Sequence, residues 1–399
     1  MIADLANWRL LRFVTLLSVR QAARRARRSL ASFIGVMGGL LLAFTQLGVQ
    51  DALYESAVRL HHALSGEVVV IPNEFDMLLN PVWFEKNALS LAAGHPSVER
   101  ITYLYELTPM IRGLNGDRAQ PLLVIGVDPL DPAIVPDRIE ADLSKLQIPG
   151  QALWDRLSRP HWGDVNGALK KNGFVELYTA MASLTFQEPL RVVDNFKMGS
   201  SITLLGSMII SLDTFRDIGG QSAERPNMAV IKLKARSDPE SVAKSLNELL
   251  PQHVHAVSVS NLIQKEKRFW SKETPIGYLL DMSAAIGIFI CAVFVGQALV
   301  QTVDENLSEY AVLRTLDVPD SAFVLAIVMT GVFLVLAATP AAALVAVVFY
   351  AVISAATGLP LEMSETRAFQ IFVMSTVTAV IAGLLTGRRL LTADPARLL

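Results

Sequence analysis

Two pairs of histidines are the first residues in this sequence whose types and spacing could do chemistry. His61 and His62 are adjacent, and His253 and His255 are separated by one residue. Residues two apart on a β-strand point to the same face, so His253 and His255 could together ligate a metal ion. Neither pair has carboxylate or cysteine partners at a matching spacing. The pattern therefore favours the alternative, in which these histidines are solvated surface side chains.

The sequence carries no motif for a bound nucleotide or for the common hydrolases. It has no GxxxxGK[ST] phosphate-binding loop and no HExxH, CxxC or GxSxG motif. Asp281 lies near one end of an apolar run, where it could relay protons, but an interfacial acid at a helix end is the more ordinary interpretation. We therefore expect no enzymatic active site, no cofactor and no metal in this chain.

The composition indicates a membrane protein with a sizeable water-exposed part. The 399 residues are 52% hydrophobic and 18% charged, with a mean hydropathy of +0.41. The formal net charge of -2 does not suggest a nucleic-acid-binding surface. Cys291 is the only cysteine, so the chain has no intramolecular disulfide.

Four apolar runs are each long enough to span a bilayer. Arginines precede the first run and follow the last, which predicts that both termini are cytoplasmic. Gly35 and Gly39 in the first run predict close helix packing. Pro340 in the third run predicts a kink or an extension beyond the membrane. The predicted borders are a basic amphipathic helix at 1–29, transmembrane helix 1 at 30–50, an extracytoplasmic (periplasmic) domain at 51–275, transmembrane helix 2 at 276–301, a cytoplasmic coupling loop at 302–320, transmembrane helix 3 at 321–356, a periplasmic turn at 357–367, transmembrane helix 4 at 368–386 and a cytoplasmic tail at 387–399.

The long segment 51–275 mixes strand and helix patterns. The β-branched runs Glu67–Pro72 and Met228–Lys234 predict strands, and Trp83–Ala93 predicts a helix. Asp238–Leu250 predicts a helix with an aspartate cap and an early proline. This alternation predicts an α+β domain inserted between the first and second transmembrane helices.

The polar segment 302–320 between the second and third apolar runs is too charged to lie in hydrocarbon. Residues at three- and four-residue steps predict a helix over Glu305–Leu316, which Pro319 ends. A helix of this length between two membrane spans would give a soluble partner a surface to bind. The alternative is a solvated connecting loop.

The arrangement of one span, a large outer domain and three more spans resembles the FtsX/MacB-type permeases of ATP-binding cassette (ABC) transporters. The segment EYAVLRTLDVPDSAF resembles the coupling helix of that family, and ADPARLL resembles its C-terminus. The residues at matching positions are Glu309, Tyr310, Leu313, Arg314 and Leu316. Asp317 replaces the usual glycine. Within the family, the stretches Thr45–Pro72 and Leu153–Val165 are similar to the DevC-like permeases.

The resemblance implies a permease subunit of the bacterial inner membrane that acts as a homodimer with a separate ATPase. That partner would bind ATP and magnesium and would press on the coupling residues, from Glu305 to Leu316. A periplasmic adaptor (membrane fusion protein) and an outer-membrane channel would complete an exporter, with lipids around the spans. The alternative is an FtsX-like relay that controls a periplasmic hydrolase or sensor and transports nothing. The missing phosphate-binding loop agrees with an ATPase supplied by another chain.

Overall fold

The structure is a computed structural model that describes residues 26–75, 77, 82–115, 119–179, 189–199, 201, 204–219, 225–305 and 319–392. The chain divides into two compact units. The first, called the helix bundle, comprises the described parts of Met1–Asp51, Tyr278–Ile353 and Leu361–Leu399. The second, called the sheet domain, comprises the described parts of Ala52–Gly277 together with Ser354–Pro360.

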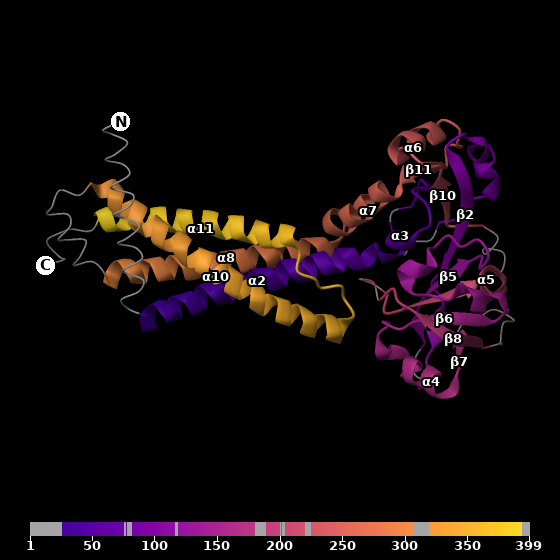
Figure 1. Cartoon of the computed structure of the whole chain (residues 1–399), viewed down its shortest axis with the longest axis horizontal. Coiled ribbons are helices and arrows are strands. Elements are labelled where there is room, and N and C mark those ends of the chain that lie inside the picture. The colour runs from indigo at the N-terminus through magenta and orange to yellow at the C-terminus, as the bar shows by residue number, and fades with distance from the viewer. Residues whose placement is uncertain are drawn as a thin grey trace. The chain divides into compact units, whose positions relative to one another are not determined.

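Within the described residues, four helices are long and apolar enough to cross a membrane (Figure 1). They are α2 Ala26–Ala57, α8 Pro275–Glu305, α10 Asp320–Thr357 and α11 Glu365–Thr392. The sheet domain is inserted between α2 and α8, so the predicted fold class is confirmed. Each helix extends beyond the span predicted within it, and the predicted membrane borders stay predictions. Pro340 lies inside α10, which continues for 38 residues, or roughly 57 Å at 1.5 Å per residue, against a hydrocarbon core of about 30 Å.

The glycines of α2 allow it to approach α8 closely, as the sequence predicts. A Cβ added to Gly39 would lie 2.8 Å from the Cα of Cys291, and one added to Gly35 would lie 3.1 Å from the Phe294 ring. Gly38, on the exposed side of α2, has nothing within 4 Å of the same position. Backbone-to-backbone packing of this kind is a main source of helix association in lipid.

We expect Gly39→Ala to lower the free energy of unfolding by about 1–3 kcal/mol, because the added methyl group would overpack the contact between α2 and α8. Gly38→Ala is the matched control, since it adds the same atoms to the same helix in open space. Thermal unfolding of the full chain in detergent micelles measures both. Equal melting temperatures for the two variants would show that this packing contributes nothing.

The described strands form one 11-stranded sheet in the order β11-β1-β10-β2-β5-β9-β6-β8-β7-β3-β4. The strands are β1 Val68–Pro72, β2 Val98–Leu107, β3 Met110–Arg112, β4 Gln120–Pro121, β5 Leu123–Val127, β6 Gln151–Asp155, β7 Val175–Thr179, β8 Leu190–Phe196, β9 Ser207–Ser211, β10 Met228–Leu233 and β11 Val254–Ser258. The pairs β5–β9 and β6–β8 are parallel and the others are antiparallel.

Helices cover both faces of this sheet. They are α3 Arg59–Ala63, α4 Val165–Asn172, α5 Leu212–Gly219, α6 Pro239–Asn247 and α7 Val259–Arg268, with the 3₁₀ helices η1 Lys86–Leu89, η2 Ala92–Gly94, η3 Pro136–Ile139, η4 Leu143–Gln147 and η5 Pro160–Trp162. The π-helix η7 Phe269–Glu273 follows α7. Val69 and Ile71 of β1 pack in the core beside α3 and α7, whereas Val68 and Val70 pack in the opposite core beside α6. Both faces of the strand are therefore buried, which explains its unbroken apolar sequence.

Several predicted elements are confirmed in this domain. β1 and β10 lie within the two predicted strands, and α6 lies within Asp238–Leu250. Asp238 caps α6 by accepting a hydrogen bond from the backbone N–H of Ser241 at 2.9 Å. The helix predicted over Trp83–Ala93 is wrong in kind, because the segment forms the two short 3₁₀ turns η1 and η2. The apolar residues Leu89 and Ala92 of these turns pack against the sheet. The two short turns therefore bury the apolar side chains of this segment without forming an α-helix.

Candidate functional site

The predicted coupling residues begin where α8 ends. Glu305 is the last residue of α8, and the Nε2 atom of Gln301 donates a hydrogen bond to its Oε1 atom at 3.2 Å. The other five predicted residues, Glu309, Tyr310, Leu313, Arg314 and Leu316, lie outside the described residues and stay predictions. So does most of the predicted amphipathic helix at 1–29, because the described part of α2 starts at Ala26.

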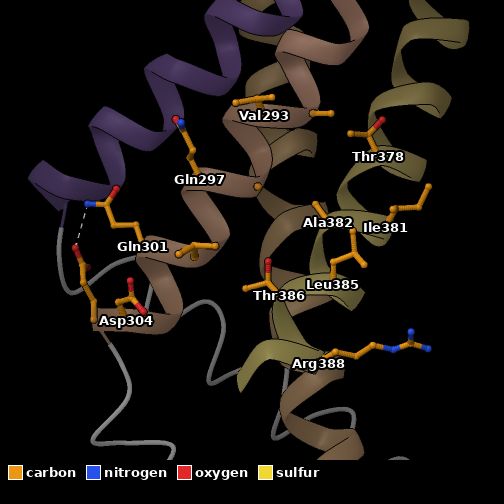
Figure 2. Close-up of a pocket in the computed structure, with 14 residues that line it drawn as sticks. Val293, Gln297, Gln301, Asp304, Thr378, Ile381, Ala382, Leu385, Thr386 and Arg388 are labelled. Atoms are coloured by element: carbon orange, nitrogen blue, oxygen red, sulfur yellow. Dashed lines mark hydrogen bonds between the residues drawn. The ribbon is translucent and has the colours of Figure 1, made fainter. Parts of the chain in front are cut away.

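A groove of about 1160 Å³ lies between α8 and α11 at this end of the bundle (Figure 2). Its polar residues gather towards the end of α8, where Gln301, Asp304 and Glu305 line it, and Arg388 of α11 lines it as well. Its remaining length is mostly apolar, with Val293 and Ile381 among the lining residues. The groove thus borders the point at which the predicted coupling segment leaves α8.

The chain from β11 to the coupling segment is helical along almost its whole length. α7 leads through the π-helical turn η7 into α8, with a single extended residue, Thr274, between η7 and α8. The Oγ1 atom of Thr274 donates to the carbonyl oxygen of Trp270 at 2.7 Å, and Trp270 is 4% exposed. A π-helical turn of this kind is often found at functional positions in helices.

The histidines predicted to be solvated include one that is buried. His61 on α3 is 1% exposed, and its Nε2 atom is hydrogen bonded to Oε2 of Glu266 on α7, which is 2% exposed. His62 is exposed, and its Nε2 atom lies 2.7 Å from Oε1 of Glu55, which also binds Lys267 of α7. The prediction was wrong for His61 because one side of α3, which includes Leu60 and His61, is buried in the folded domain. The His61–Glu266 contact thus joins α3 to α7, and the Glu55–Lys267 contact joins the end of α2 to α7.

Glu106 on β2 is a third buried ionisable residue near this pair. It is 2% exposed, and neither carboxyl oxygen has a hydrogen-bond partner among the described residues. Its backbone N–H donates to Oδ1 of Asn227 at 2.7 Å. Burial, assisted by the negative charge of Glu266, raises the pKa of the Glu106 carboxyl well above its ordinary value.

We expect Glu106→Met to raise the free energy of unfolding by about 1–3 kcal/mol at pH 7, because a buried polar group without a partner costs about that much. The raised pKa means that the folded protein binds a proton that the unfolded chain releases. Glu106 therefore destabilises the fold increasingly as the pH rises from about 4.5 towards its folded pKa. The gain in the free energy of unfolding of Glu106→Met over the wild type should be smallest below pH 4 and should grow above pH 5.

Urea unfolding of the full chain in detergent at pH 4, 6 and 8 measures this effect. Glu176→Met is the control, since Glu176 is an exposed strand residue and no pH-dependent gain is expected there. A gain for Glu106→Met that stays constant across this range would contradict the assigned ionisation.

Asp155, at the end of β6, organises a second buried polar network. It is 0% exposed, and its carboxyl oxygens accept hydrogen bonds from three backbone N–H groups and from the Ser207 hydroxyl at 3.2 Å. The three N–H donors belong to Leu157, Met198 and Gly199, at 3.1, 3.1 and 2.6 Å. Burial raises the pKa of the Asp155 carboxyl, and these hydrogen bonds act against that shift.

Arg59 on α3 extends this network. Its Nη1 atom donates to the carbonyl oxygen of Met198 at 2.8 Å, and its Nη2 atom donates to the carbonyl oxygen of Gly358 at 3.1 Å. Burial lowers the pKa of the Arg59 guanidinium, and the charge of Asp155 acts against this. Neither Arg59 nor Asp155 was predicted as a functional residue. The available signal was their location in Thr45–Pro72 and Leu153–Val165, the two stretches on which the predicted resemblance to DevC-like permeases was based.

The remaining candidates for chemistry do not converge on a reactive site. Among the described residues, no group of three or more His, Cys, Asp and Glu side chains is arranged to hold a metal ion. His255 is hydrogen bonded through Nδ1 to Oδ1 of Asn73 at 2.9 Å. Asp281 accepts a hydrogen bond from Nε2 of Gln50 at 2.6 Å. These hydrogen bonds join residues that are far apart in the sequence.

Comparison with solved structures finds proteins similar to this chain. The periplasmic region of MacB from Actinobacillus actinomycetemcomitans has 13% identity and a TM-score of 0.34, and the match covers 51% of this chain and 92% of that one. The extracellular domain of the noncanonic ABC-type transporter YknZ from Gram-positive bacteria has 12% identity and a TM-score of 0.32, covering 48% and 98% of the two chains. No protein-family model matches the sequence, and no curated protein matches it.

Proposed function

We propose that this chain is the membrane subunit of an ABC exporter. A separate cytoplasmic ATPase would hydrolyse ATP, and its closure would move the segment 302–320. The movement would change the conformation of the sheet domain, which would drive export. The chain itself would carry no catalytic residue and no cofactor, since ATP and magnesium would be bound by the partner.

The observation that carries this proposal is the helical path from the sheet domain to the polar segment, which is interrupted only at Thr274. β11 is followed without a loop by α7, η7 and α8, and α8 ends at Glu305. A second path leads from the other side of the insertion, because α2 continues to Ala57 and is followed by α3. A force applied beside Glu305 would thus act directly on elements packed in the sheet domain.

The proposed assembly is a homodimer in the bacterial inner membrane with both termini in the cytoplasm and the sheet domain in the periplasm. An adaptor and an outer-membrane channel would complete the export path, as the resemblance to DevC-like permeases implies. Membrane lipids would surround the bundle. No nucleic acid would take part.

Affinity purification of the tagged chain in mild detergent, with mass spectrometry of the proteins recovered with it, tests the proposal. We expect an ABC ATPase together with a periplasmic adaptor. Recovery of an ATPase with a wall hydrolase or a sensor kinase would replace export by an FtsX-like relay. Recovery of intact protein without any ATPase would overturn the proposed function.

A further inference from the structure

The segment Ser354–Pro360, which comprises the end of α10 and the start of its connection to α11, belongs to the sheet domain, although the rest of both helices belongs to the helix bundle. Residues Ser354–Pro360 cluster with the sheet domain as one compact unit. Within this connection, the backbone N–H of Gly358 donates to the carbonyl oxygen of Ser354 at 2.8 Å. The Oγ atom of Ser354 donates to the carbonyl oxygen of Leu359 at 2.8 Å, and Leu359 is 6% exposed. The turn is therefore held by hydrogen bonds of its own.

Arg59 joins this turn to the loop that follows β8. One guanidinium nitrogen donates to the carbonyl oxygen of Met198 and the other to that of Gly358. An arginine fork suits this task because its planar, fixed donors can hold two carbonyl groups at once. Lysine would offer one ammonium group from a flexible stem in its place.

The loop after β8 is shaped to receive Arg59. Gly199 has φ +94°, and a Cβ added there would overlap Nη1 of Arg59. Asp155 holds the same loop by accepting the backbone N–H groups of Met198 and Gly199. The loop thus has both the backbone conformation and the space that the guanidinium requires.

We propose that Arg59 is a positioning residue that ties the α10–α11 connection to the sheet domain. Movement of α10 and α11 then reaches the domain through Gly358 and the loop after β8 that contains Met198, in addition to the paths through α2 and α8. The role in coupling rests on the proposed function. The tie itself rests only on the two hydrogen bonds of Arg59 and on the shape of the loop at Gly199.

Hydrogen–deuterium exchange of the full chain in lipid nanodiscs, without nucleotide, tests the tie. In Arg59→Met we expect exchange in the 354–360 segment to rise about tenfold, the effect of losing a charged hydrogen bond. Exchange in β10 should stay unchanged. Arg59→Lys should fall between the variant and the wild type. Unchanged exchange at 354–360 in Arg59→Met would overturn the proposal.

Gly199→Ala breaks the same contact from the other side and serves if Arg59→Met does not fold. Gly173→Ala is its matched control, because Gly173 has φ +77° and nothing within 4 Å of an added Cβ. Only Gly199→Ala should raise exchange at 354–360. Adding Arg59→Met to Gly199→Ala should raise it little further, since both variants remove one contact. Equal effects of the two glycine variants would mean that backbone strain, and not Arg59, is responsible.

A second experiment separates the tie from the proposed function. With the co-purified ATPase present, trapping of nucleotide should change exchange at Phe196–Gly199 less in Arg59→Met than in the wild type, because only the paths through α2 and α8 remain in the variant. A change of equal size in both would overturn the coupling role. The exchange measured without nucleotide would still decide whether Arg59 holds the 354–360 segment. If no ATPase is recovered, the proposed function fails, while the nucleotide-free exchange still decides whether Arg59 holds the connection.

Discussion

Replacing Asp155 by alanine should lower the free energy of unfolding of the sheet domain by about 3–5 kcal/mol, the range for breaking a buried charged network. The change leaves the three backbone N–H donors and the Ser207 hydroxyl without their acceptor in a fully buried position. It also removes the negative charge that acts on the buried guanidinium of Arg59.

Urea unfolding of the full chain in detergent, followed by tryptophan fluorescence, measures this loss. Trp154 and Trp162 are buried beside the site, with ring centroids 5.6 Å apart, so they report local unfolding. Asp164→Ala is the control from the same sequence stretch, because Asp164 accepts one backbone N–H, from Gly167 at 2.8 Å, at an exposed helix cap. The control should cost about 1 kcal/mol. A loss for Asp155→Ala no larger than that would contradict the assigned network.

Asp155→Asn should also destabilise the domain, although it keeps the shape of the side chain. Three of the four groups around the carboxylate are backbone N–H donors. The amide N–H₂ group of asparagine would replace an accepting oxygen and would itself be a donor facing a donor. We expect a loss between those of the alanine variant and the Asp164 control. Stability equal to the wild type would show that Asp155 is needed for its volume alone.

The second large effect is expected at Leu313, on the proposed coupling helix. If this side chain fills a pocket on the ATPase, Leu313→Asp should reduce stimulation of ATP hydrolysis at least about tenfold, because hot-spot residues contribute about 2 kcal/mol or more. Membrane insertion should be unaffected. ATPase assays in proteoliposomes that contain both subunits measure the change. This prediction rests on the sequence and on the proposed function.

Thr315→Asp is the control for this experiment. It introduces the same charge two residues later, where a helical side chain lies on a different face. Stimulation should then stay close to that of the wild type. Full stimulation by Leu313→Asp, or equal losses from both variants, would contradict the proposed docking face.

Local patterns were sufficient to predict the helix bundle. The length and composition of an apolar run decide whether it can cross a membrane, and neither depends on distant residues. The close approach of α2 to a neighbour was also predictable, because Gly35 and Gly39 lack side chains on one face. The identity of that neighbour, α8 at Cys291, was not predictable, because it depends on how helices far apart in the sequence pack.

In the sheet domain, caps and β-branched runs predicted several elements but not their order. β1 lies between β10 and β11, whose residues come more than 150 positions later in the chain. Strand order depends on pairing between strands that are far apart in the sequence, and local patterns do not specify that pairing. The 3₁₀ turns that replaced the helix over Trp83–Ala93 have the same origin, since packing overrides local propensity.

The sequence by itself determined the membrane-length helices, the inserted α+β domain and the polar segment that we propose couples to an ATPase. Only the tertiary structure decided which polar residues are buried and paired. Glu266 meets His61 across 205 positions of sequence, and Gly358 meets Arg59 across 299. A charged residue in a polar stretch looks solvated until the fold removes it from water. At that point its desolvation must be offset by a partner, and only the tertiary fold determines which residue that is.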